Sequence, residues 1–142
     1  MPLRRDERIE VLQRIPLFAQ CAKKDLREIA RVAEEVDAEA GQVVIREGEP
    51  GHEFFVVLDG RLDVSRKRKG KVASVGPGDF VGEMALLSNK PRNATVTTAT
   101  PTRLLRIADR DFASLIERIP LLWLKIAAAL AERMPDDAYL RS

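Results

Sequence analysis

The chain has 142 residues, a length typical of one compact domain. Its 24 basic and 22 acidic side chains leave a net charge of +2, so charge alone indicates no polyanionic partner. Hydrophobic residues make up 45% and charged residues 32%, the proportions of an ordinary soluble protein. We therefore expect a single domain over residues 1–142.

Residues 1–32 are predicted to form N-terminal helices. Apolar side chains recur there at three- and four-residue steps on otherwise charged segments: Ile9, Leu12, Leu26, Ile29 and Ala30. This spacing is typical of an amphipathic helix. Asp25 fits the first turn of the second helix, where a negative charge is favourable.

Residues 33–108 are predicted to form a β structure. All eight glycines of the chain lie between positions 41 and 82. Turn signals recur about every ten residues and separate short apolar runs, among them Val43–Ile45, Phe54–Leu58 and Leu62–Val64. Leu105 and Ile107 alternate with Arg106, as expected for a half-buried strand. These features predict an all-β sandwich or barrel.

Residues 109–134 are predicted to form C-terminal helices, followed by a tail at 135–142. Apolar residues make a helical stripe there: Phe112, Leu115, Ile116, Ile119, Leu122, Trp123, Ile126 and Leu130. Pro120 either kinks this helix or opens a second segment. We expect Phe112 and Trp123 to anchor the core rather than to contact a ligand.

The cellular setting is indicated by two features. Cys21 is the only cysteine, so no disulfide can form within the chain, and the N-terminus carries no secretory signal. The longest apolar stretch, from Ile119 to Ala131, falls short of the roughly 20 residues that a membrane span needs. We expect a cytoplasmic protein without a membrane span.

The segment from Gly82 to Arg92 carries the strongest chemical signal. Gly82 lets the backbone approach a ligand, and the apolar run Met84–Leu87 suits a short helix whose first N–H groups form an anion site. Arg92 can give a phosphate two parallel hydrogen bonds. Glu83 would be repelled by that phosphate unless it accepts a hydrogen bond from a sugar hydroxyl. The segment therefore predicts a receptor for a ribose phosphate.

These residues resemble the phosphate-binding cassette of the cyclic nucleotide-binding domain family. The similar segments are Gly82–Leu87 and Pro91–Val96 within a cassette at 80–96, Ile15–Phe18, Arg46–Gly51, Gly60–Leu62 and Gly76–Phe80. The resemblance covers the chain from about Ile9 to Arg133. It implies a β jelly-roll barrel, also called a double-stranded β-helix, with helices at both ends.

The resemblance also implies roles for individual residues. Glu83 would receive the ribose 2′-hydroxyl, Arg92 would hold the cyclic phosphate, and the backbone of Gly82, Met84 and Ala85 would supply amides. Asn93 and Ala94 complete the candidate site. Asn93 departs from the family, which commonly has Ala, Ser or Thr at this position, and its amide can donate to the phosphate or to a purine edge.

The family further implies how such a domain acts. We expect a non-enzymatic sensor without a cofactor, with cAMP favoured as ligand over cGMP, whose C-terminal helices relay occupancy to an unidentified protein partner. Packing of Met84–Leu87 against the Phe112–Trp123 region would carry the signal. The tail would supply Tyr139 or Arg141 as a lid over the base, or else fray into solvent.

Alternatives remain at two points. Glu83 and Arg92 can also be read as a surface ion pair in an interaction module with a vestigial pocket. The basic run Arg66–Lys71 is expected to be a solvated hairpin tip, although it can also be interpreted as a binding surface for nucleic acid, acidic lipid or a partner protein.

Two function classes lack sequence support. His52 is the only histidine and lies in a turn, so the sequence shows neither a metal site nor a catalytic base. No helix-turn-helix follows the barrel, so we expect no sequence-specific DNA binding.

Overall fold

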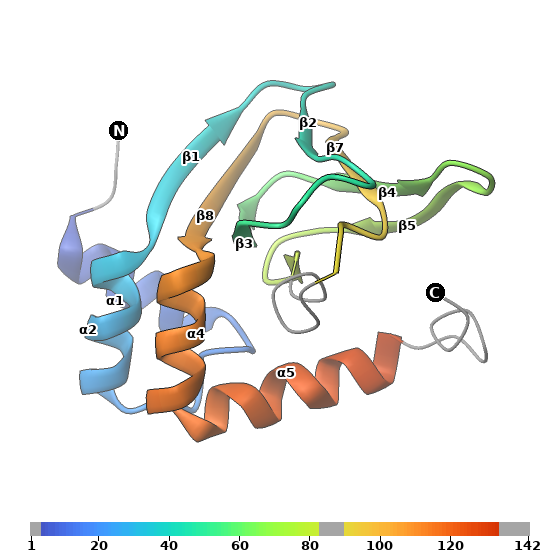
Figure 1. Cartoon of the computed structure of the whole chain (residues 1–142). Coiled ribbons are helices and arrows are strands. Elements are labelled where there is room, and N and C mark those ends of the chain that lie inside the picture. Colours follow the sequence, from blue (N-terminus) through green and yellow to red (C-terminus); the bar gives the residue numbers. More distant parts are fainter. Residues whose placement is uncertain (1–3, 83–89, 134–142) are drawn as a thin grey trace.

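The computed structural model describes residues 4–82 and 90–133, and these residues form a β structure whose helices lie together on one side of it (Figure 1). The helices are α1 (Arg5–Arg14), α2 (Lys23–Val32), α4 (Asp109–Arg118) and α5 (Pro120–Arg133). The strands are β1 (Glu34–Ala38), β2 (Val43–Ile45), β3 (Glu53–Asp59), β4 (Leu62–Arg66), β5 (Gly70–Val75), β6 (Phe80–Val81), β7 (Thr95–Thr98) and β8 (Thr102–Ala108).

Within the described residues, the strands form two four-stranded antiparallel sheets. One has the order β1-β8-β3-β6 and the other the order β2-β7-β4-β5. Strands that are distant in sequence are therefore neighbours, as when β3 pairs with β8 from Glu53↔Ala108 to Asp59↔Arg103. The predicted fold class, mainly β with a jelly-roll barrel and helices at both ends, is confirmed.

Strand β3 separates two apolar cores, which explains why its sequence is almost continuously hydrophobic. Successive side chains of a strand point to opposite faces of the sheet. Phe54 and Val56 therefore pack with the helices, whereas Phe55 and Val57 pack between the sheets. Burial on both faces removes the apolar–polar alternation that a half-buried strand would show.

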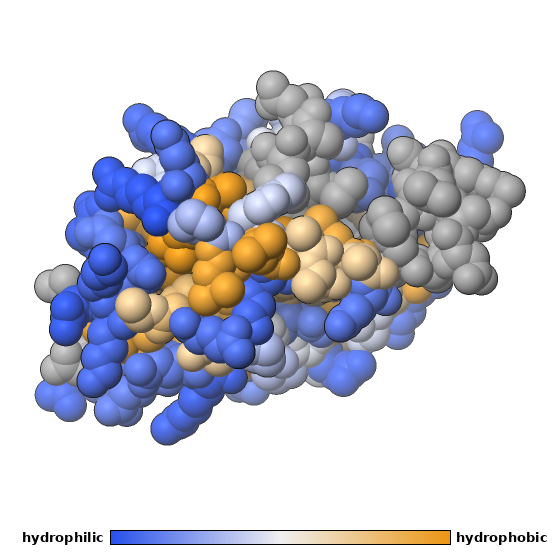
Figure 2. Space-filling view, turned by 90° about the horizontal axis from the view of Figure 1, so that it is seen from below, coloured by the Kyte–Doolittle hydropathy of each residue, from blue (hydrophilic) through white to orange (hydrophobic). Residues whose placement is uncertain are grey.

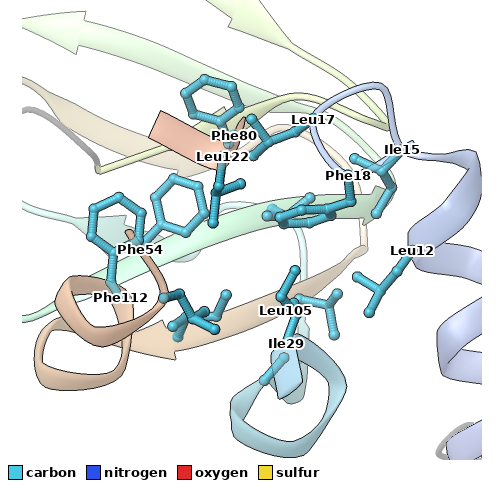
Figure 3. Close-up of a cluster of buried hydrophobic side chains, with 14 of the residues drawn as sticks. Leu12, Ile15, Leu17, Phe18, Ile29, Phe54, Phe80, Leu105, Phe112 and Leu122 are labelled. Atoms are coloured by element: carbon cyan, nitrogen blue, oxygen red, sulfur yellow. The ribbon is translucent and has the colours of Figure 1, made fainter. Parts of the chain in front are cut away.

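The helix-side core joins the two ends of the chain (Figure 3). Phe54 contacts Phe80 of β6 and Phe112 of α4, with ring centroids 5.5 Å and 4.6 Å apart. Leu12 of α1 and Leu122 of α5 belong to the same cluster. The N-terminal and C-terminal helices thus share one core on the outer face of the β3 sheet.

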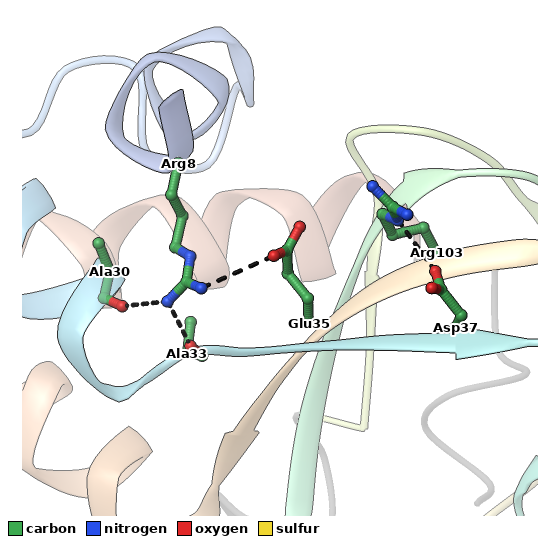
Figure 4. Close-up of polar contacts among 6 residues, drawn as sticks. All are labelled: Arg8, Ala30, Ala33, Glu35, Asp37 and Arg103. Carbon is green, nitrogen blue, oxygen red and sulfur yellow. Dashed lines mark hydrogen bonds and ion pairs between the residues drawn. The ribbon is translucent and has the colours of Figure 1, made fainter. Parts of the chain in front are cut away.

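The side chain of Arg8 fixes α1 to its neighbours (Figure 4). Its Nη1 donates to the carbonyl oxygens of Ala30 and Ala33 at 2.8 and 3.0 Å, and its Nη2 lies 3.7 Å from a carboxylate oxygen of Glu35. The guanidinium therefore satisfies carbonyls at the C-terminal end of α2, where a positive charge is also favoured by the helix dipole.

The C-terminal helices correct one prediction and decide another. Helix α4 ends at Arg118 and α5 begins at Pro120, so the proline opens a second helix, where its missing N–H costs nothing. Phe112 is buried, but Trp123 is 42% exposed, and its predicted role as a core anchor is wrong. Leu122 and Ile126, one helical turn apart, form the buried stripe, and Trp123 is turned about 100° away from Leu122.

Figure 2 shows apolar side chains gathered on the lower side of the molecule, where α5 lies.

Candidate functional site

Arg92 is the only charged residue that is buried among the described residues, with 8% of its surface exposed. Its Nη1 donates to the carbonyl oxygen of Gly82 at 2.8 Å, and its Nη2 donates to the carbonyl oxygen of Glu53 through a short hydrogen bond. By accepting these hydrogen bonds, the carbonyl oxygens lower the cost of burying the guanidinium. They also orient its plane, and an oriented guanidinium suits bidentate binding of a phosphate.

The contacts of the Arg92 guanidinium require a glycine at position 82. Its backbone has φ +96°, a conformation that residues with a side chain rarely adopt. A Cβ atom at this position would lie 2.8 Å from Nη1 of Arg92 and 2.8 Å from the carbonyl oxygen of Glu53. The glycine therefore lets the backbone at position 82 lie directly against the arginine.

The backbone of Arg92 is held by the turn after β2. The Arg92 N–H donates to the carbonyl oxygen of Glu49 at 2.8 Å, and the Gly48 N–H donates to the carbonyl oxygen of Arg92 at 2.9 Å. Both the main chain and the side chain of Arg92 are thus fixed, and the chain segments that fix them are far apart in sequence.

An ionic network lies beside this anchor. Glu53 contributes to both, because its backbone carbonyl accepts from Arg92 and its side-chain carboxylate lies 3.2 Å from Nε of Arg106. Nη2 of Arg106 is also 2.8 Å from a carboxylate oxygen of Glu34, and this hydrogen bond raises the pKa of Arg106 above its usual range. Arg106 is therefore engaged by two carboxylates and stays fully charged.

The other predicted site residues divide into two groups. Gly82 and Arg92 are in contact, and Asn93 and Ala94 continue from Arg92 towards β7, with Asn93 exposed and Ala94 half-buried. The Asn93 carbonyl oxygen accepts from Nε of Arg66 at 3.0 Å. Glu83, Met84 and Ala85 lie outside the described residues, and so do Tyr139 and Arg141 of the tail.

Sequence reasoning missed the acceptors that position the arginine. Glu53 and Glu49 act through backbone carbonyl oxygens, which carry no signature in residue type. Only the place of Glu53 at the start of β3, close to Gly82, makes its carbonyl available. The motif Arg46–Gly51 was the one sequence signal for this region, because its turn supplies the two backbone hydrogen bonds to Arg92.

Three further findings concern the described residues alone. They contain no group of three or more His, Cys, Asp or Glu side chains placed to hold a metal ion. His52 is exposed, and its Nδ1 lies 3.6 Å from a carboxylate oxygen of Asp109 at the start of α4. In the same parts of the chain, each helix is too short or too polar to cross a membrane.

Known proteins resemble this chain in sequence and in structure. A cyclic nucleotide-gated potassium channel of Mesorhizobium japonicum is 38% identical over 111 residues, which are 78% of this chain and 30% of the channel. The regulatory subunit of a cAMP-independent protein kinase A from Trypanosoma brucei superposes with a TM-score of 0.84 at 25% identity, over 97% of this chain and 49% of that one. The regulatory domain of Toxoplasma gondii protein kinase A, crystallised with cAMP, superposes with a TM-score of 0.70 at 33% identity, over 78% of this chain and 44% of that one.

The similar region is one part of larger proteins. This chain spans between 23% and 37% of the length of the curated relatives that it matches. Residues 35–119, from β1 to the end of α4, match the cyclic nucleotide-binding domain family. That stretch contains Gly82, Arg92 and the turn and strand that hold the arginine. The chain belongs to the cyclic nucleotide-binding domain family.

Proposed function

We propose that this chain binds a cyclic mononucleotide and that Arg92 holds its cyclic phosphate. The observation that carries the proposal is the buried guanidinium fixed by the carbonyl oxygens of Gly82 and Glu53. A positive charge that is oriented before the ligand arrives loses little freedom on binding, so more of the interaction energy appears as affinity. Membership of the family supplies the ligand class.

The remaining contacts of this proposal come from the resemblance. Glu83 accepts a hydrogen bond from the ribose 2′-hydroxyl, and Met84 and Ala85 contribute backbone amides, together with Gly82. Asn93 and Ala94 follow Arg92 and lie next to the phosphate. A carboxylate can remain ionised near a phosphate if a guanidinium lies between them, and we propose this role for Arg92.

We propose cAMP as the preferred ligand, with cGMP as the alternative. The kinase regulatory domain from Toxoplasma gondii, which was crystallised with cAMP, is 33% identical to this chain. The test is titration calorimetry of the full chain with each nucleotide. Micromolar or tighter binding of cAMP, with cGMP at least about tenfold weaker, supports the proposal; equal affinities or a preference for cGMP overturn the choice of base.

The role of Arg92 is tested in the same titrations. Arg92→Lys keeps a positive charge but loses the planar fork that suits phosphate, and we expect cAMP affinity to fall at least about tenfold. Arg61→Lys is a matched control, because Arg61 is an exposed arginine that donates to the hydroxyl of Ser74 at 2.8 Å. An Arg92→Lys protein that binds as well as the Arg61→Lys protein would contradict the role of the fork.

We further propose that the chain acts without catalysis and relays occupancy through its C-terminal helices to a partner protein. The supporting observation is the aromatic series Phe80, Phe54 and Phe112, which joins the residue two positions before Gly82 to helix α4. Closely packed side chains rearrange between discrete states rather than deforming smoothly. A shift of β6 on ligand binding would therefore change the packing of α4.

The relay has a natural reporter in Trp123, the only tryptophan of the chain, on the exposed side of α5. If α5 repacks when cAMP binds, the emission maximum of Trp123 shifts, and Phe54→Leu reduces the shift at saturating ligand. Fluorescence that stays unchanged while calorimetry records binding would refute the relay and leave the binding proposal intact.

A second candidate function is a protein-interaction module that does not respond to cAMP. One observation favours it: the solved structure that superposes over 97% of this chain belongs to a kinase described as cAMP-independent. The calorimetric titration separates the two candidates. Flat traces with both nucleotides, from protein verified to be free of bound ligand, would favour the interaction module.

A further inference from the structure

The hairpin between β4 and β5 carries a concentrated positive charge. It reaches away from the helices in Figure 1, and its turn consists of Lys67, Arg68 and Lys69, all exposed. In the described part of the chain, no carboxylate pairs with the side chains of these three residues, whereas Lys71 lies 3.2 Å from Asp63. Three consecutive cations therefore face solvent at one point of a chain whose net charge is only +2.

The turn is held in place by backbone contacts. The Lys69 N–H donates to the carbonyl oxygen of Arg66 at 3.0 Å and closes the turn. The Lys67 N–H donates to a carboxylate oxygen of Glu47 at 3.1 Å, on the loop after β2. Since residues 67–69 take part in these bonds only through main-chain N–H groups, their three side chains contribute charge without being needed for the shape of the turn.

The surroundings of the turn favour a slender anionic partner. Glu47 accepts a hydrogen bond from the turn, Glu49 lies in the same loop as Glu47, and Asp63 lies on β4 of the hairpin itself. A flat anionic bilayer would therefore meet carboxylates as well as cations. Nucleic acid would need aromatic side chains for stacking or a long basic track, and residues 61–79 contain no Phe, Tyr or Trp. An extended acidic peptide can contact the cations alone.

We propose that the turn at 67–69 is a docking surface for an acidic segment of a partner protein, and that its affinity depends on nucleotide occupancy. The second part rests on the proposed function. Arg66 donates from Nε to the carbonyl oxygen of Asn93, and the Glu47 N–H donates to the hydroxyl of Thr95 at 3.0 Å. These contacts join both sides of the turn to the segment that begins with Arg92.

These contacts indicate whether nucleotide binding strengthens or weakens docking. Asn93 is exposed, and a nucleotide that lies next to it, as proposed above, would restrain it. Through the hydrogen bonds of Asn93 and Thr95, the nucleotide would also restrain Arg66 and Glu47. A turn that is held more firmly loses less freedom when the acidic segment docks, so nucleotide tightens docking, and docking tightens nucleotide binding by the same factor.

The docking surface is tested by fluorescence anisotropy with a labelled octaglutamate peptide and the full chain at low salt. We expect binding that weakens at least about fivefold in the triple variant Lys67→Gln, Arg68→Gln, Lys69→Gln, because three surface charge contacts are lost. The matched control is Lys23→Gln, Lys24→Gln, Arg27→Gln, which removes three exposed cations of α2 and should leave affinity within about twofold.

Three results would overturn the docking proposal. The first is an equal loss of peptide affinity in both triple variants, and the second is no peptide binding at all. The third is binding of phosphatidylserine vesicles or a single-stranded oligonucleotide in preference to the peptide.

The linkage between cAMP binding and peptide docking is measured by repeating the peptide titration with saturating cAMP. We expect peptide affinity to rise at least about threefold, and we expect Arg66→Gln to abolish this rise. Unchanged peptide affinity in protein that calorimetry shows to be loaded with cAMP overturns the linkage. Absence of cAMP binding by calorimetry is instead a failure of the proposed function, and the docking result stands apart from it.

Discussion

Replacing Gly82 by alanine tests whether the arginine is held as the contacts indicate. The left-handed backbone at φ +96° costs an alanine about 1–2 kcal/mol. The new Cβ would also lie 2.8 Å from Nη1 of Arg92 and from the carbonyl oxygen of Glu53. Relief of this clash breaks a hydrogen bond of a charged group, which costs about 1.5–3 kcal/mol. We therefore expect Gly82→Ala to lower the free energy of unfolding by about 2.5–5 kcal/mol.

Gly41→Ala is the matched control for this change. Gly41 has φ +82°, but a Cβ at that position has no atom within 4 Å, so the variant bears the backbone cost without the clash. Its expected loss is about 1–2 kcal/mol. Urea unfolding followed by circular dichroism measures both losses, and calorimetry should show cAMP binding at least about tenfold weaker in Gly82→Ala alone. Equal destabilisation of the two variants, or full affinity in Gly82→Ala, would refute the assigned role of Gly82.

Three further predictions concern the scaffold around the site. Arg8→Ala should lower the free energy of unfolding in urea by about 2–3 kcal/mol, because two carbonyl oxygens lose their charged donor, whereas Arg4→Ala, at an exposed pair, should have no measurable effect. Phe54→Ala should cost about 3–5 kcal/mol and Leu124→Ala less than about 0.5 kcal/mol, since their exposures are 1% and 63%. Burial raises the pKa of the Cys21 thiol, so the folded chain should react more slowly with a chromogenic disulfide reagent at pH 8 than the urea-unfolded chain; equal rates would contradict this.

The elements with strong local signals could be predicted from sequence. The apolar run in β3 and the glycine-marked turns identified the β region, and Pro120 marked the junction between two helices. Strand β1 gave no such signal, because Glu34, Glu35 and Asp37 make it look like a surface segment. It is a strand because it pairs with β8, where Glu34 opposes Arg106 and Asp37 opposes Arg103. Pairing at this sequence separation leaves no local pattern.

The candidate site shows the same division between local and distant information. Gly82 and Arg92 could be selected by residue type and spacing, since the chemistry of phosphate binding requires them. Their mutual contact and the carbonyl oxygens of Glu53 and Glu49 depend on how four chain segments meet, which the sequence does not encode locally. The exposure of Trp123 was mispredicted because a stripe of apolar residues wider than one face does not reveal which side meets the core.

The most direct test of the central claim asks whether Arg92 acts on the phosphate rather than on the fold. Calorimetry would compare cAMP with adenosine, which lacks the phosphate, on the unmodified chain and on Arg92→Lys. We predict that the substitution weakens cAMP at least about tenfold and changes adenosine affinity by less than about threefold, because only cAMP offers the group that the guanidinium binds. Equal weakening of both ligands, or of neither, would contradict the claim that Arg92 holds the cyclic phosphate.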